Sequence, residues 1–252
     1  LDFENCGSIG NICTDNYTSC SSAVCSTVPV VELNNSDRIS LWTGGINGSM
    51  DDLVLNVTLP FPITLYNTTS YHAQVTTNGV RIRTFIHVNT KNLTLLLIGS
   101  LSEYLSDAWQ ETSLPSSAFG LAVFPHWDDL YIQAKTWQGI YYASQGISPN
   151  REIIFEYYLS YYMLPSTFCH FQVTFFEATP DIVEFTYFDV LDGGLSATIG
   201  VQSKKNFFFI ILFVNIYLES GAGPYLQIDA VETNVTFTFD TNLGTYTNSS
   251  IG

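Results

Sequence analysis

The sequence predicts an all-β protein: an antiparallel β-sandwich, jelly-roll-like, with a small disulfide-rich N-terminal segment. Short runs rich in β-branched and aromatic residues alternate with turn signals along most of the chain, a pattern typical of antiparallel sandwiches and barrels. Hydrophobic residues make up 46% of the 252 residues and aromatic residues 15%, so the chain can bury a sizeable core. The sequence has no glycine-rich nucleotide loop and no clear amphipathic helix, which argues against an α/β fold.

Four of the five cysteines gather near the N-terminus, within twenty residues of Ser-, Thr- and Asn-rich sequence: Cys6, Cys13, Cys20 and Cys25. They include no Cys-x-x-Cys pair of the kind that zinc sites favour, so we expect two disulfides in an oxidising compartment, with three pairings open. Cys169 is expected to be a lone buried thiol. We divide the chain into a Cys-rich segment (1–33), a sandwich domain (34–245) and a polar tail (246–252).

The first half of the chain contains short extended runs in which apolar and polar residues alternate. Pro60 and Pro62 are expected to break one of these runs, because proline cannot donate to a sheet ladder. Asn78-Gly79 is the dipeptide preferred in two-residue hairpin turns, so the run after it should pair with the run before it. The predicted extended runs cover 28–33, 39–42, 53–59, 63–66, 71–77 and 80–88.

The second half repeats the same pattern with stronger strands. The stretch 92–104 is ambiguous between helix and strand, and we interpret it as a strand followed by a loop. A connection at 106–117 leads into an apolar run that starts at Phe119 and ends at Asp128 and Asp129. Further strands are predicted at 139–143, 152–162, 168–177, 182–190, 197–202 and 231–239.

The run 207–214, FFFIILFV, fits the pattern poorly. Together with the residues that follow, it is too short to span a bilayer, which needs about 20 apolar residues. A fully buried strand is the simplest interpretation, and an exposed aggregation or membrane-contact segment is the alternative.

The charge balance excludes some partners. The chain has 8 basic and 23 acidic residues, a formal charge of −15, so it cannot form the basic patch that nucleic acid or an anionic membrane requires. Cations become plausible partners. Eight Asn-x-Ser/Thr sequons indicate a secreted glycoprotein; they begin at Asn16, Asn34, Asn47, Asn56, Asn67, Asn92, Asn234 and Asn248.

Seven phrases, in order, resemble a family of extracellular β-sandwich modules related to the NIDO domain: LPFPITLY (59–66), VTTNGV (75–80), FPHWDDL (124–130), GIYY (139–142), PNREIIFEY (149–157), FQVTFFE (171–177) and SATIGVQ (196–202). The resemblance implies a secreted or surface module without defined catalytic residues. The Cys-rich start and the ending FTFDTNLGTYT are similar to secreted ascomycete proteins, which implies a fungal source. Two features depart from the family pattern: the run 207–218, which looks inserted, and His126.

Asp128 and Asp129 are the strongest candidate site. Adjacent carboxylates at a strand end offer the oxygen ligands that Ca²⁺ prefers, and their side chains should point to opposite faces. The alternative is that they end the strand and accept backbone N–H groups in the turn. Nearby aromatic residues suggest an open surface for stacking on sugars or on a protein. The candidate ligand-binding set is Asp128, Asp129, Trp127, Tyr131 and Tyr141.

A carboxylate pair for glycoside hydrolysis is a second hypothesis. Glu152 and Glu156 share a strand face but should lie about 13 Å apart, farther than either glycosidase spacing. Glu177 and Glu184 flank a turn and can approach each other across a hairpin. The sequence has neither a Gly-x-Ser-x-Gly elbow nor a His-Glu-x-x-His motif. We assign no catalytic residues.

The leading functional prediction is a non-enzymatic secreted or cell-surface module for adhesion, for binding glycans or the cell wall, or for assembling extracellular matrix. Its expected partners are extracellular glycans or matrix components, with Ca²⁺ as a candidate cation. The alternatives are a secreted glycan-active hydrolase and a self-assembling structural protein that associates through exposed strand edges.

Overall fold

A computed structural model describes residues 8, 10, 19–21, 24–26, 31–34, 39–44, 49–77, 82–83, 114, 121–134, 136–202, 209–211 and 231–251. These residues form antiparallel strands and no helix. The strands are β1 (Ser19–Ser21), β2 (Val24–Ser26), β3 (Ile39–Thr43), β4 (Val54–Leu65), β5 (Thr68–Thr76), β6 (Ile82–Arg83), β7 (Ala122–Trp127), β8 (Leu130–Tyr131), β9 (Gly139–Gln145), β10 (Glu152–Tyr161), β11 (Leu164–Phe176), β12 (Ile182–Val190), β13 (Thr198–Gln202), β14 (Phe209–Ile211), β15 (Val235–Asp240) and β16 (Thr245–Ser250).

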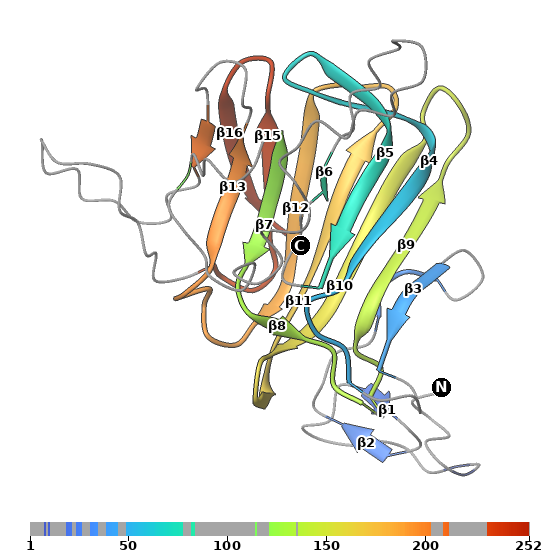
Figure 1. Cartoon of the computed structure of the whole chain (residues 1–252), viewed down its shortest axis with the longest axis vertical. Coiled ribbons are helices and arrows are strands. Elements are labelled where there is room, and N and C mark those ends of the chain that lie inside the picture. The colour runs from blue at the N-terminus through green and yellow to red at the C-terminus, as the bar shows by residue number, and fades with distance from the viewer. Residues whose placement is uncertain are drawn as a thin grey trace, which may run out of the picture.

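The strands pack as two layers, which confirms the predicted β-sandwich (Figure 1). The main sheet has the order β16-β15-β12-β11-β10-β9-β3, and β8 pairs with the end of β10. The facing layer consists of the β4–β5 hairpin and the sheet β14-β13-β7-β6. A separate hairpin, β1–β2, places Cys20 opposite Cys25 in the backbone register. Cys6 and Cys13 lie outside the described residues, so the two disulfides remain a prediction.

Aromatic residues fill the space between the layers. On the main sheet, Tyr157 stacks on Phe171 at a ring distance of 4.9 Å, and Phe185 lies 4.6 Å from Phe239 on the neighbouring strand. The hydroxyl of Tyr187 donates to the main-chain oxygen of Pro125 in the opposite layer. Fully burying a side chain of this size stabilises a fold by about 1.5–3 kcal/mol, so this aromatic core holds the two layers together.

The β4–β5 hairpin differs from the predicted pairing. Strand β4 continues through Pro60, and its register with β5 shifts between Thr58 and Ile63. An irregularity of this kind tolerates proline because some ladder hydrogen bonds are already missing there. The turn is formed by Tyr66 and Asn67, both at positive φ. Residues Ile82 and Arg83 form β6, which pairs with β7. Most of the run 80–88 and Asn78-Gly79 lie outside the described residues, so the predicted hairpin between 71–77 and 80–88 stays a prediction.

The C-terminal end is also more ordered than predicted. The predicted tail begins at residue 246 and is polar, as expected. It is not a loose end, however, because Thr245–Ser250 form β16, the edge strand next to β15. Within the run 207–214, Phe209–Ile211 form β14, which pairs with β13. The structure does not describe the side chains of this strand, so whether the run is buried or exposed stays open. Residues 92–104 are likewise not described. No helix in the described ranges is long and apolar enough to cross a membrane.

Candidate functional site

The acidic corner between β7 and β8 is built around Asp128, which is only 6% exposed. Its Oδ1 accepts the main-chain N–H of Asp129 at 2.7 Å, and its Oδ2 accepts the hydroxyl of Ser196 at 2.5 Å. Hydrogen bonds to a carboxylate are short and roughly twice as strong as neutral ones. Asp128 therefore fastens this corner to the loop 191–197, which connects β12 to β13.

A buried hydrogen-bond chain runs beside this corner to the same loop. Nε2 of His126 lies 2.8 Å from the hydroxyl oxygen of Tyr161, and that hydroxyl donates to Oδ1 of Asp192 at 2.5 Å. Because the tyrosine proton goes to the carboxylate, we assign the ring proton of His126 to Nε2, which then donates to Tyr161. The other ring nitrogen, Nδ1, is buried, and no described residue donates to it.

Burial sets the protonation states along this chain. It lowers the pKa of His126, against the opposing effect of the Asp128 and Asp192 carboxylates. It also raises the pKa of Tyr161 far above its ordinary value. The histidine is therefore neutral and the tyrosine protonated at neutral pH. Since Ser196 gives its proton to Asp128 rather than to a histidine, these groups form a structural network and not a nucleophile–base pair.

The loop 191–197 owes its shape to two glycines. Gly193 and Gly194 have φ values of 69° and 70°, a region that other residues enter at a cost. The N–H of Gly194 donates to Oδ1 of Asp192 at 2.9 Å, and a Cβ added at Gly194 would lie 3.7 Å from Cε1 of His126. This turn brings Asp192 onto the buried network.

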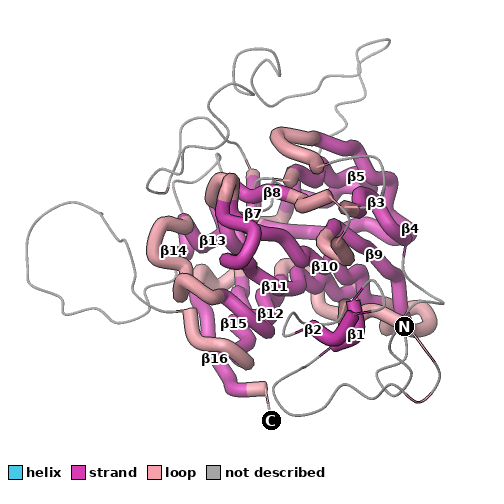
Figure 2. Tube along the Cα trace, turned by 90° about the horizontal axis from the view of Figure 1, so that it is seen from below, coloured by secondary structure: helices cyan, strands magenta, loops and turns pink. Residues whose placement is uncertain are grey.

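Three loops lie next to this network at the lower end of the molecule in Figure 1, the end that faces the viewer in Figure 2: the β7–β8 corner, the β10–β11 hairpin and the loop 191–197. They carry several exposed apolar residues. Met163, at the tip of the β10–β11 hairpin, is 78% exposed. The ring of Tyr131 meets that of Tyr162 edge-on at 5.6 Å. We call this surface the base rim; its members are Tyr131, Tyr162, Met163, Leu164, Leu191 and Leu195.

The structure separates the residues that the sequence proposed as one ligand-binding set. Trp127 and Tyr141 are 2% and 1% exposed, so they cannot line an open surface as we expected. Trp127 stacks on Phe124, and the hydroxyl of Tyr141 donates to the main-chain oxygen of Trp137. Sequence alternation misjudged them because both faces of their strands are covered. Asp129 and Tyr131 remain half-buried at the base rim.

The calcium hypothesis finds limited support in these contacts. Both oxygens of Asp128 already accept hydrogen bonds from the protein. Among the described side chains, no three His, Cys, Asp or Glu residues cluster in a way that could hold a metal ion. Ca²⁺ needs six to eight oxygen ligands, so Asp128 and Asp129 would have to recruit main-chain oxygens and water. The calcium site remains a prediction.

Glu156, one of the carboxylates considered for hydrolysis, is completely buried on the outer face of the main sheet. It accepts the main-chain N–H groups of Glu32 and Leu33 at 2.6 and 2.7 Å, and its Oε1 is hydrogen-bonded to Nε2 of His170 at 2.6 Å. These contacts dock residues 31–33 onto the sheet. A carboxylate engaged in this way is a structural anchor rather than an acid facing a substrate.

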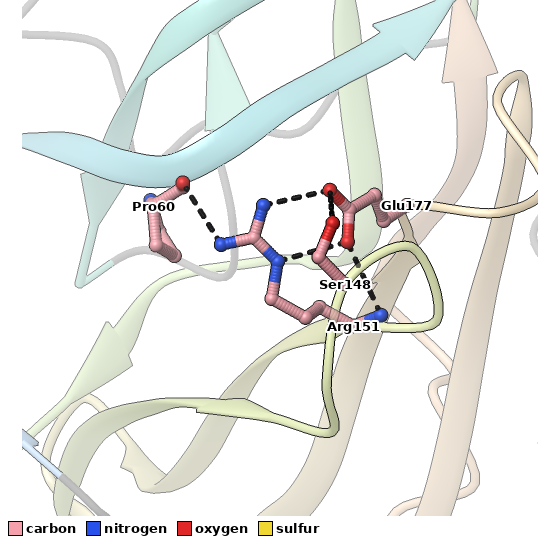
Figure 3. Close-up of polar contacts among 4 residues, drawn as sticks. All are labelled: Pro60, Ser148, Arg151 and Glu177. Carbon is pink, nitrogen blue, oxygen red and sulfur yellow. Dashed lines mark hydrogen bonds and ion pairs between the residues drawn. The ribbon is translucent and has the colours of Figure 1, made fainter.

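Glu177 is occupied by a second structural contact, which Figure 3 shows. Its carboxylate accepts Nε and Nη2 of Arg151 at 2.8 and 2.7 Å, and the hydroxyl of Ser148 at 3.1 Å. The hydrogen bonds from Arg151 hold the pKa of Glu177 at about 2, well below its ordinary 4.5. Arg151 also donates to the main-chain oxygen of Pro60 at 3.3 Å and thereby ties β4 to the main sheet.

Sequence reasoning missed three members of the network: Tyr161, Asp192 and Ser196. The sequence around each of them gives only a weak indication of a site. Tyr161 belongs to a tyrosine doublet, and Asp192 and Ser196 flank the Gly-Gly turn. Their partners are 31 to 68 positions away in the sequence. Only the closing of the sheet brings them together.

Comparisons with known proteins agree with the resemblance noted from the sequence. A family model described as NIDO related matches residues 36–222. This range includes every residue of the buried network and of the base rim. Neither the curated proteins nor the solved structures yield a match to the chain.

Proposed function

The chain belongs to the NIDO-related family, and we propose that it is a non-enzymatic extracellular module that binds its partners through the base rim. Membership in this family fits an extracellular module in broad terms, and such modules are in general non-catalytic. Within the functions that the sequence suggested, adhesion and matrix assembly have the most support, because both require an exposed contact surface rather than a reactive centre.

The base rim is the single observation that carries this proposal. Exposed apolar side chains that gather on neighbouring loops often mark a site of interaction. Here the exposed side chains lie on loops that hydrogen bonds hold together. Tyr161 donates to Asp192 and so connects the end of β10 to the loop 191–197, and Ser196 donates to Asp128 and so connects the same loop to the β7–β8 corner. Loops held in place lose little entropy on binding, which favours a dedicated contact surface.

The hydrolase is the runner-up, and the carboxylate geometry gives it little support. Glu156 is buried against His170, and Glu177 is clamped by Arg151. Glu184 accepts the hydroxyl of Thr238 at 2.9 Å on the outer face of the main sheet. Each of these three carboxylates is bonded to another group of the protein, whereas a glycosidase needs an acid and a base free to flank the sugar.

Secretion is part of the proposal and rests on the sequons. Five of the eight lie in described regions with their asparagine exposed: Asn34, Asn56, Asn67, Asn234 and Asn248. We expect protein secreted from a eukaryotic host to lose mass when treated with peptide-N-glycosidase, and the asparagines to be converted to aspartates at these positions. Unmodified asparagine at all five would contradict the glycoprotein prediction.

Binding to extracellular polymers tests the function as a whole. The secreted protein is applied to a glycan array and to insoluble cell-wall and matrix fractions, with calcium or with a chelator. We expect binding that is lost in Met163→Asp and kept in Leu243→Ser, which removes an exposed leucine at the far end of the sandwich. Release of reducing sugar from any of these polymers would favour the hydrolase instead. Binding that disappears with the chelator would support the calcium site.

A further inference from the structure

The base rim has a composition that points to a particular kind of partner. Four of its six members are aliphatic or thioether side chains, namely Met163, Leu164, Leu191 and Leu195. These side chains cannot donate or accept the hydrogen bonds that sugar hydroxyls require, whereas they fit an apolar pocket on a protein. Tyr131 and Tyr162 add an aromatic pair with polar tips at one edge, as is usual in protein interfaces.

The rim is also rigid at its base. Besides the hydrogen bonds from Tyr161 and Ser196, the N–H of Tyr162 donates to the main-chain oxygen of Asp129 at 2.9 Å. The N–H of Leu191 donates to the main-chain oxygen of Phe168 at 3.2 Å. Each of the three loops is therefore fastened to a neighbour.

Charge narrows the choice of partner further. Asp129 and Asp192 border the rim, and both are half-buried. The guanidinium of Arg151 is engaged with Glu177 in another loop region. With a formal charge of −15 for the whole chain, a second copy of the protein or an anionic membrane is repelled.

We propose that the base rim docks onto a protein surface that offers an apolar pocket bordered by lysine and arginine side chains, with Met163 at the centre of the contact. The inference rests on the proposed function and adds the chemical class of the partner. Aliphatic side chains enter the pocket, while the carboxylates of Asp129 and Asp192 face the basic border. Opposite charges at the border of an interface speed association and fix orientation more than they add affinity.

A pair of designed probes tests the partner class. One is a helical amphipathic peptide of leucine and lysine, and the other replaces every lysine by glutamate. Affinities for the intact protein are measured by fluorescence anisotropy at low and high salt, on wild type, Met163→Asp, Asp129→Asn and the control Leu243→Ser. We expect the lysine peptide to bind, Met163→Asp to weaken it about tenfold or more, and Leu243→Ser to leave it unchanged. Asp129→Asn should reduce the salt dependence, and the glutamate peptide should not bind.

Several outcomes would overturn the inference. Equal binding to Met163→Asp and to Leu243→Ser would show that the lysine peptide is attracted to general negative charge. Binding of the glutamate peptide, or of anionic lipid vesicles tested in parallel, would contradict the role of the acidic border. Glycan binding that depends on Met163, without peptide binding, would keep the proposed function and reject a protein partner. If neither the polymers nor the lysine peptide bind, the proposed function itself fails.

Discussion

Single buried side chains decide how the base of the molecule is held together. Asp128 and Asp192 each accept two hydrogen bonds from different segments, and Tyr161 connects Asp192 to His126. A buried polar group that loses its partner costs about 1–3 kcal/mol, so each member of this network stabilises the others. His126 is thus part of the support beneath the base rim.

Replacing Tyr161 by phenylalanine tests the network. The substitution keeps the ring but removes the hydroxyl between His126 and Asp192, so we expect a loss of about 1–3 kcal/mol in the free energy of unfolding. Urea denaturation measures the change. Tyr162→Phe is the matched control, because it removes the hydroxyl of the adjacent, exposed tyrosine. If the two variants are equally stable, the hydrogen-bond chain is not a stabilising element.

Glu156 makes a second residue-level prediction. Glu156→Gln removes the negative charge that faces His170 and the two backbone N–H groups of Glu32 and Leu33. A hydrogen bond to a charged group contributes about 1.5–3 kcal/mol, and a buried donor left without its acceptor costs a similar amount. We expect a loss of this order and faster amide exchange at 32 and 33. Glu152→Gln, on the same strand, is the control and should leave both quantities nearly unchanged.

The ion pair between Arg151 and Glu177 predicts an acid-sensitive stability. The pKa of Glu177 is lowered to about 2 in the folded protein from an ordinary 4.5. Its contribution is therefore fully present above about pH 4.5 and is lost as the pH falls toward 2. Thermal unfolding measured from pH 5 to pH 2 should decline less steeply in Glu177→Gln. Parallel curves for the two proteins would contradict the assignment.

At the scale of the elements, the sequence predicted strands better than their partners. Period-two alternation identified β10, β11, β12 and β13 within a few residues, because one face of each strand is packed in the core. It missed β16, whose exposed polar residues carry no such alternation. Pairing was predicted from Asn78-Gly79, whereas the β4–β5 turn uses Tyr66 and Asn67 and has no glycine to announce it.

The β4–β5 turn offers a matched pair of substitutions. Asn67 has a φ of 58°, and its N–H donates to Oδ1 of Asp181 at 2.8 Å. Asn67→Gly and Asn67→Ala both remove the sequon, so the difference between their free energies of unfolding reports the cost of the positive φ in the backbone. We expect the alanine variant to be less stable than the glycine variant by about 1–2 kcal/mol, measured by urea unfolding. Equal stability would mean that the turn relaxes to a negative φ.

At the scale of the whole molecule, the sandwich brings the site together from three separate parts of the sequence. The β7–β8 corner, the β10–β11 hairpin and the loop 191–197 meet at the lower end in Figure 1 because β7 and β10 belong to opposite layers. The sequence identified the corner from its adjacent acids. It could not place Tyr161 and Ser196 beside it, since contacts of this kind depend on the packing of one sheet on another.

The fold also explains why the candidate surface lies at one end of the sandwich. Loops between strands carry exposed side chains on a rigid frame, which suits a contact surface. The core residues of β7 and β9 that seemed to belong to the site, Trp127 and Tyr141, instead provide part of that frame. An acidic module that exposes apolar side chains on the loops of the base rim is therefore the description that joins composition, fold and proposed function.

Hydrogen–deuterium exchange of the module, alone and saturated with the leucine–lysine peptide, tests the central claim most directly. We predict new protection at three segments only, residues 129–131, 161–164 and 191–196, with the peptides from the β15–β16 turn unchanged. Protection that is spread over the acidic surface, or that falls at the opposite end of the sandwich, would contradict a binding site at the base rim.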